Sequence, residues 1–202
     1  VETWVYVQNA QHEGYIVSKK GRAYGGHVAY GIRQTKDQFT VRFQVASCLS
    51  CTDSIHFIDL RSQPIQEGRW YHVVARYDET SGLGSLFVNG TEQDSVTRGT
   101  GLVYTSNSEP LAVGSTHVSS VTTEESYWDG TLSHLNIFSQ ALSDSDISSL
   151  AQGSTISAVP QLTYNGNING STVDDQSGNG HHANVDGVTL IDECHNQDVD
   201  GD

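Results

Sequence analysis

Residues 70–90 constrain the fold most, because they form two strand-like runs separated by a turn. Over residues 70–77, aromatic and β-branched residues occupy both alternating sets of positions, which predicts a strand buried on both faces. Residues 78–84 are rich in Ser, Thr and Gly, and residues 85–90 end in the turn pair Asn-Gly. We therefore expect a central antiparallel hairpin that places three side chains between two sheets. They are Val73, Ala75 and Phe87.

Length and composition favour one all-β domain. The 202 residues include 20 Gly and only 3 Pro, which suits many short strands joined by turns. The formal net charge of −14 leaves no basic stripe to meet phosphates, so it argues against nucleic acid and against an anionic membrane surface. No apolar run approaches the roughly 18 residues of a membrane span. The acidity is typical of a soluble, secreted protein.

Further segments show strand or helix patterns. Strands are expected at residues 2–7, 15–19, 30–32, 39–45 and 55–60. A Ser-Asp-Ser-Asp run at residues 143–146 predicts the cap of a short helix that ends near Gly153.

The segment 39–45 alternates most cleanly between apolar and polar residues. We expect Phe39, Val41, Phe43 and Val45 to face the core. The polar set between them, Thr40, Arg42 and Gln44, faces outward and is a candidate ligand face.

Four blocks of sequence resemble the laminin-G-like, concanavalin A-like jelly-roll family. They are the hairpin with its Trp-Tyr-His-Val-Val-Ala-Arg-Tyr-Asp strand and Val-Asn-Gly turn, the Leu-Ala-Val-Gly run at 111–114, the strand at 128–138, and the Ala-Leu-Ser helix turn at 141–150. The resemblance implies an antiparallel β-sandwich with a core over residues 1–153. It does not imply one activity, because this fold hosts lectins, adhesion modules, glycosidases, lyases and spacers.

Residues 160–190 resemble the stretch that opens such a domain, yet they stand at the C-terminal end of this sequence. Three explanations are open. The domain is circularly permuted, a second repeat begins here, or the segment completes a neighbouring copy. We favour permutation or donation, because an unpaired opening strand would leave an exposed edge. We expect residues 154–191 to complete a sandwich and 192–202 to form an acidic linker or the start of a calcium repeat.

An acidic, Gly-rich loop within this segment is the best candidate for chemistry. Asp174, Asp175 and Asn179 offer the oxygen ligands that Ca²⁺ prefers. In the family this loop borders a calcium site that also uses an Asp at the position of Ser133, so one carboxylate is missing here. The alternative is a loop whose glycines and Asn only permit a tight turn.

The tail carries a second acidic pattern. Asn196, Asp198 and Asp200, followed by Gly201, form half of a D-x-[DN]-x-[DN]-G calcium loop and resemble the start of thrombospondin type-3 or EF-hand-like repeats. A flexible acidic linker explains the same residues.

Three cysteines remain open to interpretation. Cys48 and Cys51 are expected to form a local disulfide in an oxidising compartment, with zinc binding and a redox pair as the alternatives. Cys194 is left over and is expected to pair with a residue outside this sequence. Two sequons make Asn89 and Asn169 formal glycosylation acceptors, although Asn89 is equally explained by the turn that the hairpin needs.

The function predicted from these features is an extracellular, non-catalytic module that binds a glycan or an extracellular protein. Aromatic and His side chains are the candidate ligand contacts, although core packing is the alternative for each aromatic residue and the favoured one for Trp128. They are Tyr24, His27, Tyr30, Tyr127 and Trp128. Paired carboxylates suited to glycoside hydrolysis are not evident, since Glu124 and Glu125 fall in a predicted loop. The alternative function is a structural module that self-associates head to tail.

Overall fold

The computed structural model describes residues 1–20, 28–44, 57–98, 110–115, 127–166 and 168–189. Their strands form two large antiparallel sheets and one small sheet. The first eight strands are β1 (Glu2–Val7), β2 (Glu13–Lys20), β3 (Val28–Thr35), β4 (Gln38–Gln44), β5 (Phe57–Arg61), β6 (Arg69–Asp78), β7 (Leu83–Val88) and β8 (Thr91–Thr97). The later elements are β9 (Leu111–Val113), β10 (Gly130–Ile137), α1 (Asp144–Ala151), β11 (Leu162–Tyr164), β12 (Ile168–Asn169), β13 (Thr172–Val173) and β14 (Ala183–Asn184).

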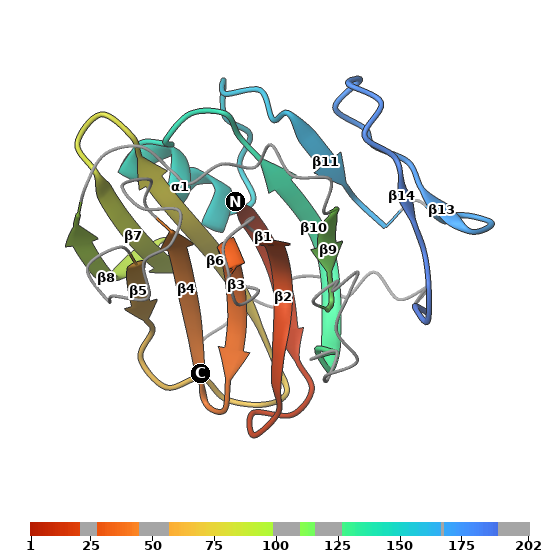
Figure 1. Ribbon diagram of the computed structural model, residues 1–202, viewed down its shortest axis with the longest axis horizontal. Helices are drawn as coiled ribbons and strands as arrows, with labels where there is room; N and C mark the ends of the chain where they lie inside the picture. The colour runs from red at the N-terminus through yellow and green to blue at the C-terminus, as the bar shows by residue number, and fades with distance from the viewer. Residues whose placement is uncertain (21–27, 45–56, 99–109, 116–126, 167, 190–202) are drawn as a thin grey trace.

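The architecture is an antiparallel β-sandwich, as the sequence predicted. One sheet has the strand order β11-β10-β1-β6-β7-β8, and the other has the order β5-β4-β3-β2-β9. Figure 1 shows the two sheets layered over each other, with β13 and β14 beyond the β10–β11 edge. Both sheets contribute to one apolar interior, which includes Phe39, Val41 and Phe43 from β4 as expected.

The β6–β7 hairpin occupies the middle of the six-stranded sheet, and β6 is buried on both faces. Val73 and Ala75 face the shared interior, where they are 0% and 3% exposed. Phe87 contradicts the expectation, because it lies on the opposite face of the sheet in a second apolar cluster with Leu142 and Ile147. The prediction was wrong because a period of two separates the faces of a strand but does not say which face meets the other sheet.

The helix α1 closes this outer face. Ser143 caps its N-terminus as predicted, accepting a hydrogen bond from the backbone N–H of Asp146, whose carboxylate bonds back to the Ser143 N–H. Ile147 is fully buried against the sheet.

β8 was not predicted. Its sequence is polar, and its one apolar residue, Val96, packs against the interior, so the strand carries little hydrophobic pattern. Asn89 and Gly90 form the β7–β8 turn with φ values of 50° and 76°, which fits the type I′ hairpin turn that Asn-Gly favours.

β11 lies at the edge of its own chain's six-stranded sheet. It pairs antiparallel with β10 through Leu135 and Tyr164, Asn136 and Thr163, and Ile137 and Leu162. Leu162 and Tyr164 are 8% and 9% exposed and belong to the main core. The segment after Pro160 therefore contributes a core strand to the same chain.

Candidate functional site

The predicted aromatic contacts do not form one described site. Tyr24 and His27 lie outside the described residues. Tyr30 and Trp128 both pack against the main core, and burial raises the pKa of the Tyr30 hydroxyl. Of the described candidates, Tyr127 is the one that is prominent on the surface, with 61% of its area exposed.

Trp128 packs against the core of the sandwich and does not form an exposed platform for a ligand. Its Nε1 donates to the side-chain oxygen of Gln34 at 2.9 Å, and Gln34 is itself fully buried. Gly14 allows this approach, because a Cβ at that position would collide with the carbonyl oxygen of Tyr127 and lie 2.7 Å from the Trp128 Cα.

Asp175 organises the acidic loop that was predicted to bind calcium. Its carboxylate accepts hydrogen bonds from the backbone N–H groups of Thr163, Ser177 and His181 at 2.9–3.0 Å and from the Ser177 hydroxyl at 2.8 Å. Burial acts to raise the pKa of Asp175, but these donors outweigh it and hold the pKa well below its ordinary value. The loop is thus fastened to β11 by an ionised carboxylate.

The other loop residues predicted as calcium ligands also have protein partners. Asn179 donates from Nδ2 to the backbone oxygen of Gln161 at 3.0 Å, and Asp174 lies 3.2 Å from the His182 Nδ1. Among the described residues, no three His, Cys, Asp or Glu side chains are grouped to hold a metal ion. Ca²⁺ binding at Asp174, Asp175 and Asn179 stays a prediction.

Several predicted residues fall outside the described part of the chain. They are Cys48, Cys51, Cys194, Asn196, Asp198 and Asp200. The disulfide and the tail calcium loop therefore remain predictions.

Both sequons lie on exposed turns. Asn89 holds the hairpin, because its Oδ1 accepts from the His72 backbone N–H at 2.9 Å. Asn169 is exposed at the end of β12 and is followed by Gly170 with φ 63°. Glycosylation at either residue remains a prediction.

A buried polar cluster on the outer face of the six-stranded sheet was missed in the sequence. Glu2 is fully buried, and its Oε1 accepts from Nε2 of His72 at 3.0 Å and of His134 at 2.8 Å. Its Oε2 accepts from Asn136 Nδ2 at 2.7 Å, and Asn136 Oδ1 accepts from the Thr163 hydroxyl at 2.8 Å. The cluster joins β1, β6, β10 and β11.

Burial acts to raise the pKa of Glu2, but the interactions with His134 and His72 outweigh it and lower the pKa to about 2. One sequence signal could have revealed this cluster. Glu2 and His72 both lie in segments whose neighbouring residues predicted buried strands.

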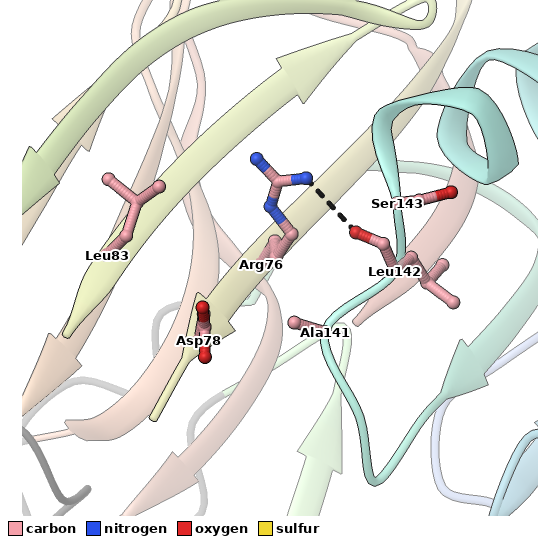
Figure 2. A pocket seen from close by; sticks show the side chains of 6 residues that line it. All are labelled: Arg76, Asp78, Leu83, Ala141, Leu142 and Ser143. Atoms are coloured by element: carbon pink, nitrogen blue, oxygen red, sulfur yellow. Dashed lines mark hydrogen bonds between the residues drawn. The ribbon is translucent and has the colours of Figure 1, made fainter. Parts of the chain in front are cut away.

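A cavity of about 360 Å³ opens between β6, β7 and the segment that precedes α1. Figure 2 shows Asp78 and Leu83 on the strand side and residues 141–143 on the helix side. The lining combines a guanidinium, a carboxylate, a hydroxyl and apolar side chains. The residues are Arg76, Asp78, Leu83, Ala141, Leu142 and Ser143.

Arg76 lines this cavity and is held in place by contacts on both sides of it. Its Nη1 donates to the Leu142 carbonyl oxygen at 3.0 Å and to the Asp144 carboxylate at 2.5 Å. Its Nη2 donates to Ser85 Oγ at 3.3 Å, and its guanidinium carbon lies 4.6 Å from the centre of the Phe87 ring. Arg76 thereby links the sheet to the start of α1.

Asp78 is half-buried at the end of β6. It accepts from the Thr80 backbone N–H at 2.9 Å and from the Ser81 hydroxyl at 2.7 Å. Hydrogen bonds from Ser81 and Thr80 lower its pKa, so Asp78 is ionised at neutral pH and acts only as an acceptor.

The chain belongs to the concanavalin A-like lectin/glucanases superfamily, whose laminin G-type family model matches residues 1–148. No curated protein matches it in sequence. In the described part of the chain, none of the helical structure is long and apolar enough to cross a bilayer.

Two solved structures share the fold. A candidate carbohydrate-binding protein from Bacteroides ovatus ATCC 8483 superposes with a TM-score of 0.66 at 18% identity, over 88% of this chain and 49% of that one. This chain thus spans about half the length of the B. ovatus protein. A heptameric SAP-like pentraxin from Limulus polyphemus gives a TM-score of 0.51 at 15% identity, over 74% of this chain and 67% of the pentraxin chain. At these identities the likeness shows the fold alone.

Proposed function

We propose that this chain is a non-catalytic, extracellular carbohydrate-binding module, and that the cavity beside α1 holds the sugar. The observation that carries the proposal is the lining of this cavity. A carboxylate acceptor, Asp78, stands beside apolar Leu83 and opposite Ala141 in a space of about 360 Å³. Pockets of this size suit small ligands, and few polar groups in an apolar setting fix ligand orientation.

Asp78 retains acceptor capacity for a sugar. The Asp78 carboxylate accepts from the Thr80 backbone N–H and the Ser81 hydroxyl, and it also interacts with the Ser81 backbone and the Thr80 side chain. Because Asp78 is only half-buried, its solvent-facing oxygen lone pairs suit a sugar hydroxyl donor, while Leu83 offers an apolar surface to the C–H groups of a sugar ring.

The B. ovatus protein, described as carbohydrate-binding, supports a sugar-binding role, whereas the superfamily includes both lectins and glucanases and does not decide between binding and catalysis. The position of β11 supports a binding module over a module that self-associates head to tail by donating this strand. The reason is that β11 pairs with β10 in the sheet of its own chain. A glycan or an extracellular protein that carries one is the proposed partner.

The test is a glycan array probed with the labelled chain, followed by titration of any positive glycan into the Asp78→Asn variant. Asn keeps an acceptor for the Thr80 N–H but removes the charge, so the turn is retained. We expect at least tenfold weaker binding by the variant. An array without positives, or unchanged affinity in Asp78→Asn, would refute the proposal.

Glu67→Gln is the matched control, since it removes the same charge from an exposed residue just before β6. Asp78 stands at the other end of this strand, roughly 30 Å away. The control should bind as the parent chain does.

A further inference from the structure

We infer that the cavity beside α1 selects neutral glycans and discriminates against glycans that carry carboxylate or sulfate groups. This inference rests on the proposed function and adds the chemical class of the ligand. It follows from two features of the cavity: its guanidinium is already paired with carboxylates of the protein, and carboxylates outnumber cations around it.

Within the described lining, the one guanidinium is engaged by the protein itself. Arg76 is only 12% exposed in its side chain, and it contacts Asp144 at 2.5 Å and Glu92 at 3.6 Å. Its remaining contacts to the Leu142 carbonyl and to Ser85 occupy both terminal nitrogens. An acidic sugar would have to displace these partners to pair with Arg76, so the cavity lacks a ready cation for it.

Carboxylates predominate around the cavity. Asp78 lines it, and Asp144 and Glu92 are 77% and 42% exposed in their side chains. The adjoining segments add Glu79 and Asp146. Among the residues that the structure describes, these five acidic groups face two cations, Arg76 and the exposed Arg98, whose backbone N–H bonds to the Gly82 oxygen beside Leu83.

This excess of three negative charges repels an anionic ligand and does not affect a neutral one. Like charges about 8 Å apart repel by about 0.5 kcal/mol each in water, and three such pairs correspond to about a tenfold loss of affinity. The Asp78 carboxylate requires a donor, which the hydroxyl groups of neutral sugars provide. A carboxylate or sulfate oxygen placed there would meet another acceptor.

The experiment compares matched glycan pairs by calorimetric titration with the whole chain. Suitable pairs are lacto-N-tetraose with its sialylated form, and xylotetraose with its glucuronic acid-substituted form. We expect the neutral member of a pair to bind about tenfold more tightly than the acidic member in 20 mM salt. The difference should narrow in 500 mM salt, because salt screens exposed charges.

Equal or tighter binding of the acidic member overturns the charge selection and leaves the proposed function standing. Binding of neither member of any pair, together with an array without positives, overturns both. The Asp78→Asn variant should lose affinity for the neutral glycan and show a smaller difference within the pair. Leu83→Ala should weaken both members alike, and Glu67→Gln should leave both affinities and their ratio unchanged.

Discussion

Replacing Glu2 by Gln tests the buried polar cluster that joins four strands of the six-stranded sheet. A fall in the pKa of Glu2 from an ordinary value of 4.5 to about 2 corresponds to about 3 kcal/mol of folding stability at neutral pH, at 1.36 kcal/mol for each pKa unit. The Gln amide cannot accept from both His72 and His134 and from Asn136, so at least one buried donor loses its acceptor. We expect a loss of about 3 kcal/mol, or roughly 6–12 °C in Tm.

The pH dependence gives the sharper test. The folded-state pKa lies below the unfolded one, so the Glu2 contribution is fully present above about pH 4.5 and is lost as the pH falls towards 2. Urea unfolding followed by Trp fluorescence should give free energies of unfolding for the parent chain and for Glu2→Gln that differ by about 3 kcal/mol at pH 7. The two values should converge near pH 2. Equal stability at pH 7, or a difference that persists at pH 2, would refute this reasoning. Glu67→Gln serves as the control.

Three further predictions concern packing, the acidic loop and calcium. Phe87→Ala should destabilise the fold by about 3–5 kcal/mol, because the ring is 2% exposed beneath α1; a loss below 1 kcal/mol in urea unfolding would contradict its place in the outer cluster. Asp175→Ala should leave three backbone donors without an acceptor and speed amide hydrogen exchange at Thr163, Ser177 and His181, whereas unchanged exchange would show that the carboxylate does not fasten the loop. Millimolar Ca²⁺ should raise Tm if the loop around Asp174 and Asn179 binds it, and identical melting curves with Ca²⁺ and with chelator would remove this site.

The sandwich was predictable from local pattern because alternation marks strands and Ser143 marks the start of α1. The side of the sheet on which Phe87 lies was not predictable. Both faces of β6 and β7 are buried, one by the opposite sheet and the other by α1. A periodic pattern then carries no information about which face is which.

The polar clusters depend on contacts between distant segments, which explains why the sequence did not reveal them. Glu2 meets partners 70, 132 and 134 residues away, and each pairing follows from strand register. The cavity likewise joins Asp78 to residues 141–143. By contrast, the loop around Asp175 was recognisable from its local sequence, although its hydrogen bonds to Thr163 were not.

The most direct test of the proposed sugar site is backbone amide NMR of the labelled chain titrated with a neutral glycan that binds on the array. Glycan binding at the cavity predicts chemical-shift changes concentrated at Asp78–Leu83 and Ala141–Ser143. Changes centred on Tyr127 instead, with the amides around Asp78 unmoved, would contradict the account.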